Sequence, residues 1–339
     1  MNRIVFARGC VLALLTAASA HAGSYRLVHE VKIAGDTGWD YLTFNAPDHR
    51  LFVSHGTRVE VVDTQGLMPV GSIADTPGVH GIAIANDLGR GYVSAGASSA
   101  IVVFDLKTLA HIGEIKTGAN PDAILYEPDT KRVFSFNGRG RDVTVVDATR
   151  NESVATIPLD AKPEFAVSDG AGHVFVNLED RNSIAQIDVK TLAVTSTWPL
   201  SGCEEPSGLA IDRKHHRLFS VCSNQVMQIV DSLDGHAVAL VPIGRGVDGA
   251  GFDDSAQLAF ASAGEGLLTV VKEQSPEKFK VVANIHTKPG ARTMTVDQAT
   301  HRVFLPTALR GPAPAATEAQ PRPRGPVIEG TFEVLVIEP

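Results

Sequence analysis

The sequence predicts an all-β fold, a seven-bladed β-propeller with four strands in each blade. The first observation is a cadence of four short β-rich runs, separated by turns, that recurs about every 42 residues. The second observation is that the chain holds seven copies of this cadence. A repeat of that length and strand content is typical of a propeller blade, in which each repeat forms one small sheet.

The clearest copy covers residues 121–157, with runs at 121–126, 133–136, 142–147 and 153–157. In most copies a basic or polar residue opens the second run and an aromatic residue follows shortly after it. The opening positions are Arg50, Arg90, Arg132, His173, Arg217, Gln257 and Arg302. The third run ends on an acid in five copies, at Asp63, Asp105, Asp147, Asp188 and Asp231. We interpret these aspartates and those of the turns as structural, because Asp stabilises turns through local hydrogen bonds.

The two ends of the repeat region are complementary. Residues 332–337 resemble the third strand of a blade with no fourth strand after it, and residues 25–33 resemble a fourth strand with no blade before it. We therefore expect the N-terminal strand to complete the last blade and close the ring. Closure of this kind removes the open sheet edges that a linear array would expose.

Residues 1–22 have the composition of a secretory signal peptide. Arg3 and Arg8 form a basic region ahead of a short apolar stretch, Cys10 to Ala18, and residues 20–22 read Ala-His-Ala, a typical cleavage site. We expect a periplasmic or secreted mature domain over residues 23–339. Cleavage near Ala22 leaves 28 basic and 38 acidic side chains, a balance that argues against nucleic acid and against anionic membranes as partners. We expect no membrane insertion, and a monomer.

The repeat resembles that of exported bacterial YVTN-repeat β-propellers. Residues 132–137, Arg-Val-Phe-Ser-Phe-Asn, and residues 143–147, Val-Thr-Val-Val-Asp, match the two strand motifs of that family. The resemblance extends from about Tyr25 to Pro339. It implies the propeller fold, but it does not imply an activity, because one fold hosts many functions.

Candidate functional residues come from the position that opens the first strand of each blade. In a propeller this strand lines the central channel, so seven equivalent positions form a ring around one mouth. The seven residues are Asp40, His80, Asp122, Glu164, Ser207, Asp248 and Arg292, at spacings of 40, 42, 42, 43, 41 and 44. Trp39 lies beside Asp40, and His55 ends a second strand on the same face, so both join the predicted ligand-binding set.

Two interpretations of this ring stay open. A water-filled channel needs polar lining, and an acid at this position belongs to the repeat. Alternatively, crowded carboxylates raise one another's pKa or hold a cation. The sequence has no established metal or phosphate motif, and we expect no cofactor unless oxygen ligands hold Ca²⁺ or Mg²⁺. The candidate ligands are Asp40, Asp122, Glu164 and Asp248.

Two functions follow from these interpretations. The first is a non-catalytic propeller that binds a small-molecule ligand or a partner protein through its mouth face. The second is a lactonase-like hydrolase or lyase, by analogy with seven-bladed enzymes of those classes. In that version His80 is the general base, Arg292 binds a substrate carboxylate, and a divalent cation assists.

Three further features are predicted from the aligned repeats. Residues 306–331, rich in Pro and Ala, form a loop insertion in the seventh blade, either a tolerated insertion or a lid or partner-contact arm beside Arg292. Cys203 and Cys222 fall on the same face of the fifth blade, which predicts a disulfide bond. His215 and His216 fall in a turn on the opposite face, where we expect solvated side chains.

Overall fold

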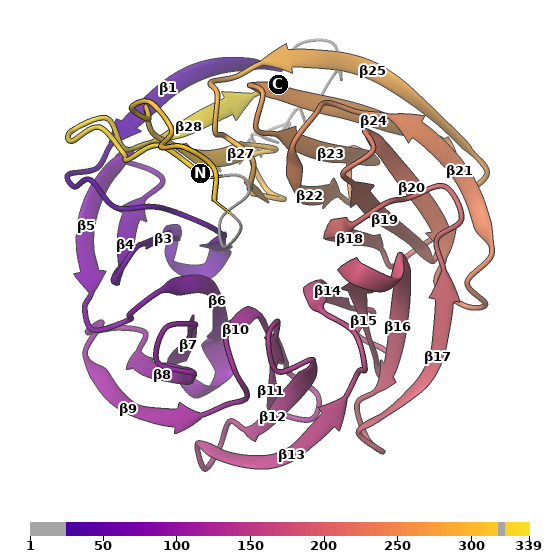
Figure 1. The fold of residues 1–339 in the computed structure, drawn as a ribbon, viewed down its shortest axis with the longest axis horizontal. Helices are drawn as coiled ribbons and strands as arrows, with labels where there is room; N and C mark the ends of the chain where they lie inside the picture. Colours follow the sequence, from indigo (N-terminus) through magenta and orange to yellow (C-terminus); the bar gives the residue numbers. More distant parts are fainter. Residues whose placement is uncertain (1–24, 318–322) are drawn as a thin grey trace, which may run out of the picture.

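A computed structural model describes residues 25–317 and 323–339 as a ring of seven antiparallel sheets, each with four strands (Figure 1). The predicted seven-bladed propeller is confirmed. The first strand of each blade lies next to the central channel and the fourth lies at the rim. The predicted signal peptide, residues 1–22, lies outside the described residues. Among the described residues, no helix has the length and apolarity to cross a membrane.

The first three blades run from the channel to the rim in chain order. Blade 1 contains β2 (Leu42–Asn45), β3 (Arg50–His55), β4 (Arg58–Asp63) and β5 (Met68–Ile73). Blade 2 contains β6 (Val79–Ala85), β7 (Arg90–Ala95), β8 (Ala100–Asp105) and β9 (His111–Lys116). Blade 3 contains β10 (Pro121–Glu127), β11 (Arg132–Asn137), β12 (Asp142–Asp147) and β13 (Glu152–Pro158).

The next three blades repeat the same order. Blade 4 contains β14 (Pro163–Ser168), β15 (His173–Leu178), β16 (Ser183–Asp188) and β17 (Ala193–Pro199). Blade 5 contains β18 (Pro206–Asp212), β19 (Arg217–Cys222), β20 (Val226–Asp231) and β21 (Ala237–Pro242). Blade 6 contains β22 (Val247–Asp253), β23 (Leu258–Ala263), β24 (Leu267–Ser275) and β25 (Lys278–His286). Three short 3₁₀ helices occupy turns, η1 (Ala46–Asp48), η2 (Asn86–Leu88) and η3 (Glu179–Arg181).

Blade 7 is assembled from both ends of the chain, as predicted. It contains β26 (Thr295–Val296), β27 (Val303–Thr307) and β28 (Glu333–Glu338), and β1 (Arg26–Lys32) pairs with β28 as its outer strand. Ion pairs support this closure, because Glu333 contacts both Lys32 and Lys288, and Lys288 also reaches Glu30 at 2.7 Å. Among the described residues, the strands from the two ends of the chain therefore pair with each other and complete the seventh sheet.

The aromatic residue of each second strand forms the core between blades. At most 1% of each of these side chains is exposed: Phe52, Tyr92, Phe134, Phe175, Phe219, Phe260 and Phe304. Burying one such ring stabilises the fold by roughly 1.5–3 kcal/mol. The sixth copy matches the repeat least well, and its structure differs from the sequence alignment by one residue. Leu258 pairs with Lys272 in blade 6, at the position where Arg217 pairs with Asp231 in blade 5. Leu258, and not Gln257, thus occupies the arginine position.

The aspartates that end third strands are structural, as predicted. The Oδ1 atom of Asp105 accepts hydrogen bonds from the backbone N–H groups of Lys107 and Thr108, and Asp188 caps its turn in the same way. His216 is exposed, as expected. The prediction of a solvated side chain is wrong for His215, whose ring contacts two buried carboxylates.

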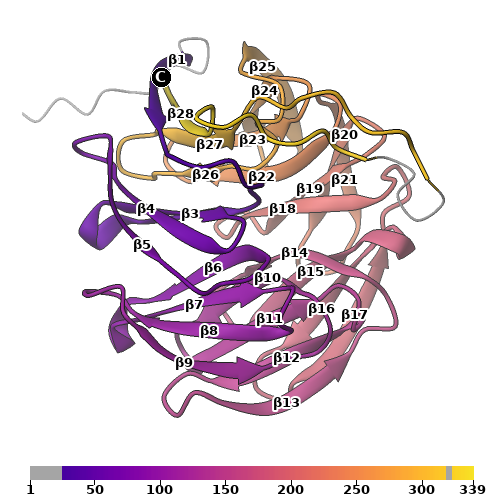
Figure 2. The same cartoon turned by 60° about the vertical axis from the view of Figure 1, so that its left-hand side comes forward.

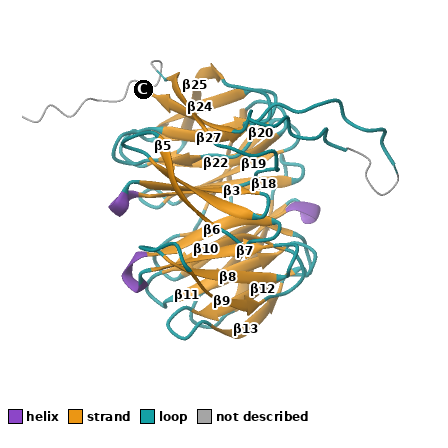
Figure 3. Cartoon of the chain, turned by 90° about the vertical axis from the view of Figure 1, so that its left-hand side faces the viewer, coloured by secondary structure: helices purple, strands orange, loops and turns teal. Residues whose placement is uncertain are grey.

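We call the insertion of blade 7, residues 306–331, the arm; its described parts, 306–317 and 323–331, extend away from the sheets (Figures 2 and 3). Its two ends pair with each other, because Gly311 N–H donates to the Pro326 carbonyl and Ile328 N–H donates to the Leu309 carbonyl. The base of the arm is thus more ordered than its Pro- and Ala-rich composition indicates. Backbone pairing satisfies polar groups that side chains of this kind cannot.

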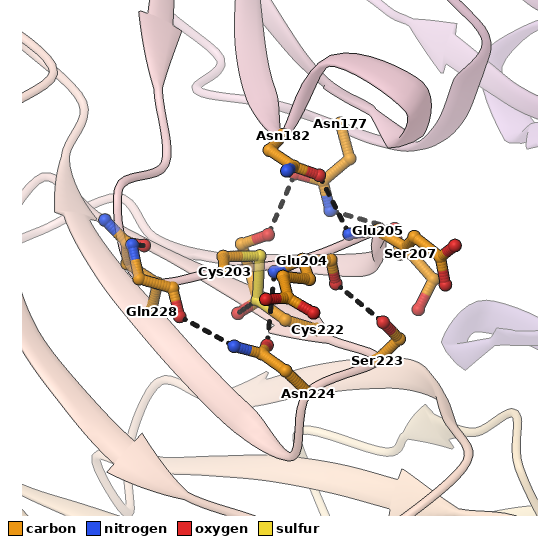
Figure 4. The surroundings of a disulfide bond; sticks show 12 residues. Asn177, Asn182, Cys203, Glu204, Glu205, Ser207, Cys222, Ser223, Asn224 and Gln228 are labelled. Atoms are coloured by element: carbon orange, nitrogen blue, oxygen red, sulfur yellow. Dashed lines mark hydrogen bonds between the residues drawn. A yellow bond between two sulfur atoms is a disulfide. The ribbon is translucent and has the colours of Figure 1, made fainter.

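The predicted disulfide between Cys203 and Cys222 is confirmed, with a Cα–Cα distance of 5.3 Å (Figure 4). It links the loop that enters blade 5 to the end of β19. Neighbouring bonds tie the same two segments together, because Ser223 N–H donates to the Glu204 carbonyl and Glu204 N–H donates to Asn224 Oδ1 (Figure 4). Disulfides persist in oxidising compartments.

Replacing both cysteines by alanine is expected to lower the free energy of unfolding by about 3 kcal/mol, because the bridge closes a loop over a sequence separation of 19 residues. The thermal midpoint, measured by circular dichroism, should fall by several degrees. Reducing the wild-type protein should produce a similar decrease, and the double variant should not respond to the reductant. A variant as stable as the oxidised wild-type protein would contradict this role.

Candidate functional site

Hydroxyl groups of neighbouring strands fix the backbone at the channel mouth, the end of the channel where second strands turn into third strands. Ser54 Oγ accepts a hydrogen bond of 2.7 Å from Asp40 N–H, and Thr293 Oγ1 donates one of 2.6 Å to the Asp40 carbonyl. Ser94 Oγ donates to the Asp122 carbonyl in the same way. The Thr293 and Ser94 bonds join adjacent blades and the Ser54 bond lies within blade 1, so the side chains at the mouth start from a rigid frame.

Three of the predicted residues meet on one side of the mouth. His80 is the second residue of β6, and its Nδ1 atom lies 2.7 Å from Asp40 Oδ2 and 3.6 Å from Asp122 Oδ1. The histidine side chain is 28% exposed, whereas the two carboxylates are about half as accessible. The Asp40 contact orients the imidazole ring and leaves Asp122 as a second acid beside it.

Arg292 extends this cluster to the other side of the mouth. Its Nε atom donates to Asp248 Oδ2 at 2.7 Å, and its Nη2 atom donates to Asp40 Oδ1 at 3.1 Å. Asp40 thus contacts both His80 and Arg292. The five side chains form one continuous series of charged contacts across blades 3, 2, 1, 7 and 6, which we call the mouth chain. Its members are Asp122, His80, Asp40, Arg292 and Asp248.

The other two members of the predicted ring stand outside the mouth chain. Glu164 pairs with Lys162 at 2.6 Å, and Lys162 also contacts Glu179. Ser207 Oγ donates to the Val247 carbonyl at 3.3 Å. The sequence reasoning missed Lys162, which neutralises part of the acidic charge, because nothing in the repeat distinguishes it from a solvated loop residue.

Tyr41 is a second residue that the sequence reasoning missed, although its place directly after Asp40 is a usable signal. Its ring packs against Phe165 with centroids 4.8 Å apart, which joins blade 1 to blade 4 below the mouth. Beneath this pair lies a cavity of about 340 Å³, whose lining includes apolar residues such as Leu42, Val167 and Leu209 and polar ones such as Arg213, Asp254 and Gln298. Burial and the surrounding carboxylates raise the pKa of Tyr41, which stays a neutral phenol.

Two residues of the predicted ligand-binding set lie away from the mouth chain. His55 is fully buried and stacks on Phe332 with centroids 4.2 Å apart. Trp39 is also buried, and the guanidinium of Arg310 lies 4.7 Å above its ring. Both side chains pack between blades 1 and 7 because Phe332 leads into β28 at the closure. The repeat alignment gave the backbone positions of the two residues, but packing at the closure sets the direction in which their side chains point.

The arm adds positive charge on one side of the mouth. Arg292 and burial lower the pKa of Arg324, which indicates that the two guanidinium groups are near each other. Burial, Arg324 and Arg292 likewise lower the pKa of Arg310. The mouth is therefore polar across its width, with guanidinium groups near blade 7 and carboxylates near blades 3 and 4.

Burial raises the pKa of the carboxyl groups at the mouth. For Asp122 the value rises to about 7, since burial and the charges of Asp40 and Asp248 outweigh the opposing effect of His80. Burial also raises the pKa of Asp248, against the opposing charge of Arg292. For His80, burial disfavours the charged form, but the Asp40 hydrogen bond and the Asp122 charge outweigh it and raise the pKa. The mouth thus holds a proton that titrates near neutral pH.

A divalent cation has one candidate site at the mouth. Ligand atoms of Asp40, His80 and Asp122 lie within 4.8 Å of one another. The predicted set of four carboxylates does not come together, because Asp248 pairs with Arg292 and Glu164 pairs with Lys162. One imidazole and two carboxylates suit a transition metal better than Ca²⁺ or Mg²⁺, which prefer oxygen ligands alone.

Comparison with known proteins identifies the fold class and no particular family. A scan against protein-family models found no match, and a search of the curated proteins found none. Among solved structures, the chain is similar to hydrazine synthase of Kuenenia stuttgartiensis, with a TM-score of 0.69 and 19% identity over 80% of this chain and 94% of that one. It is also similar to the WD40 repeats of RRP9, with a TM-score of 0.73 and 9% identity over 95% of this chain and 99% of that one. At these identities the likeness concerns the fold alone.

Replacing Asp122 with asparagine is expected to make the protein more stable than the wild type at pH 8 and about equally stable at pH 4. An acid whose pKa is raised from 3.8 to about 7 on folding destabilises the native state progressively across that pH range. The variant should gain between about 1 and 4 kcal/mol over the wild-type protein above pH 7, and little near pH 4. Urea unfolding at the two pH values measures the difference. An equal effect at both values would show that Asp122 ionises normally.

Proposed function

We propose that this chain is an exported propeller that binds a positively charged group of a ligand or partner protein at its channel mouth. The observation that carries the proposal is the excess of carboxylates there. Asp40, Asp122 and Asp248 share two positive partners, Arg292 and His80. Glu164 and Glu179 share one, Lys162. Two directly paired cations, Arg292 and Lys162, and one histidine serve five carboxylates, and the guanidinium groups of Arg310 and Arg324 add positive charge only on the side of blade 7.

The raised carboxyl pKa values support a cationic ligand. Burial raises the pKa of Asp122, Glu164 and Asp248, so the mouth favours protonated acids when it is empty. A bound ammonium or guanidinium group supplies the missing positive charge and favours the ionised acids instead. Binding near pH 7 then releases protons. The rigid frame of hydroxyl bonds keeps these groups in place before the ligand arrives.

A hydrolase or lyase at the same mouth is the second candidate, and the Asp40–His80 pair favours it. A carboxylate that fixes an imidazole is the arrangement of a general base. In this version the base activates water, with or without a divalent cation at Asp40, His80 and Asp122. Binding is the better-supported function because the two carboxylates that contact His80 raise its pKa and favour the protonated imidazole, which cannot accept a proton from water. The guanidinium of Arg292 is also engaged by two carboxylates, which compete with a substrate carboxylate.

We propose export to the periplasm or the exterior, removal of residues 1–22, and a monomeric mature chain over residues 23–339. The disulfide and the composition of the leader support export. Membership of the YVTN-repeat family also stays a proposal, supported by the matching strand motifs and the propeller fold. The arm, over residues 306–331, is proposed to contact the ligand or partner, since its arginines lie near Arg292.

Calorimetric titration of the mature protein with agmatine, spermidine and a lysine-rich peptide tests the binding function. At low salt and pH 7, at least one of these cations should bind and release protons, which two buffers of different ionisation enthalpy make measurable. Asp122→Asn combined with Glu164→Gln should weaken binding by at least tenfold. That loss corresponds to about 1.4 kcal/mol, within the range for one charged hydrogen bond.

The matched control is Asp129→Asn combined with Glu152→Gln, which makes the same two kinds of substitution at exposed residues of blade 3 away from the mouth. It should bind like the wild-type protein. Equal weakening in both double variants, or no binding of any cation, contradicts the proposal. Turnover of a lactone by the wild-type protein that disappears in His80→Ala would favour the enzyme instead.

A further inference from the structure

A second cluster of ionisable groups lies on the face opposite the mouth, at the junction of blades 5 and 6. Asp212 ends β18, His215 lies in the turn that follows, and Glu273 lies near the end of β24. The His215 Nδ1 atom is 2.7 Å from Asp212 Oδ2 and 2.8 Å from Glu273 Oε1. Only 1% of either carboxylate side chain is exposed, whereas 23% of the histidine side chain is.

Hydrogen bonds do not account for this convergence. One imidazole N–H cannot form two full-strength, well-aligned hydrogen bonds, and neither short contact has hydrogen-bond geometry. Both oxygens of Glu273 and the Oδ2 atom of Asp212 are left without a hydrogen-bond partner although they are buried. The other oxygen of Asp212 accepts from the backbone N–H groups of Lys214 and His215, which fixes the carboxylate in place. Unpartnered buried carboxylates are costly.

Glu273 differs in chemical character from the residues at the same position in the other blades. Glu273 follows Lys272, which occupies the position of the third-strand aspartate in the other blades. In each of blades 1 to 6, the residue at the position of Glu273 donates its N–H to a carbonyl in the turn between the first two strands, and its side chain is buried. At this position the other five blades have small or apolar residues, namely Thr64, Leu106, Ala148, Val189 and Ser232. The fold therefore does not require a carboxylate here, and an apolar residue would avoid its cost.

His215 breaks the repeat as well. It lies two residues before the second-strand opening, and the corresponding turn residues in the other blades are Asp48, Leu88, Thr130, Ala171, Ala256 and Thr300. The two departures from the repeat come from adjacent blades and meet at one point. A shared ligand explains both, whereas blade packing explains neither.

We propose that Asp212, His215 and Glu273 bind one divalent transition-metal ion, with Zn²⁺ preferred, which links blade 5 to blade 6. One imidazole nitrogen and two carboxylate oxygens are ligands that Zn²⁺ and Mn²⁺ accept, and neighbouring ligand atoms around zinc are about 3.3 Å apart at bond lengths near 2.0 Å. The three ligand atoms already lie within 4.8 Å of one another. Water completes the coordination from the exposed side of His215. This site is separate from the mouth and does not depend on the function proposed there.

Zinc titration of the tag-free mature protein, after treatment with EDTA and dialysis, tests the site. The wild-type protein should bind Zn²⁺ and gain about 5 °C in thermal midpoint at one hundred times Kd. MgCl₂ and CaCl₂ should give a smaller shift. Glu273→Val, which restores the residue type of Val189 in blade 4, should fold, should lose one equivalent of bound Zn²⁺, and should lose the corresponding shift. Glu273→Gln should do the same with nearly unchanged shape.

Two controls make the test specific. Asp234→Asn removes an exposed acid from the cluster of Asp231, Asp234 and His236 in blade 5 and should keep the equivalent. Asp122→Asn alters the mouth, including the separate candidate cation site there, and should keep the equivalent and the thermal shift that Glu273→Val loses, so a failure here is distinct from a failure of the mouth proposal. A wild-type protein that binds no Zn²⁺, or a Glu273→Val variant with the same stoichiometry and thermal shift, would overturn the proposal.

Discussion

The pairing of β1 with β28 is the constraint on which the rest of the structure depends. It places the first blade directly against the last, although their residues are far apart in the sequence. Asp40 and Arg292 are separated by 252 positions and still contact each other at 3.1 Å. Without closure, the mouth would hold two unconnected groups, Asp248 with Arg292 and Asp40 with His80 and Asp122. The mouth chain is therefore a consequence of how the ring is closed.

The chemistry of the mouth follows from charged side chains that the ring holds close together, although their desolvation costs free energy. Burying ion pairs gives little net stability, because desolvation offsets the attraction between the charges. A propeller core made from the aromatic residues of its second strands is stable without them. The carboxylates nevertheless gather in one place with too few cations, and the hydroxyls of Ser54, Ser94 and Thr293 fix their backbone. That combination is the reason to assign function to the mouth.

The architecture was predictable because it rests on repeated local chemistry. Phe134 and its counterparts specify one buried position per blade, and the complementary ends at 25–33 and 332–337 specify closure. Constant spacing also placed the mouth residues at equivalent positions. Side-chain direction was not predictable, since it depends on loops that differ between blades. His55 turned into the closure to stack on Phe332, and Arg292 was engaged by Asp40 and Asp248. His215 was misjudged because Glu273, its buried partner, comes from the next blade.

Carbon-13 NMR of the aspartate carboxyl groups tests the central claim, that ring closure gathers an excess of buried acid at the mouth. In protein labelled at the aspartate side-chain carboxyl carbon, one resonance should titrate near pH 7 and disappear in Asp122→Asn. Aspartates in turns, such as Asp105, should titrate below the ordinary value, because backbone hydrogen bonds lower their pKa. A spectrum in which every aspartate titrates below pH 5 would contradict the account.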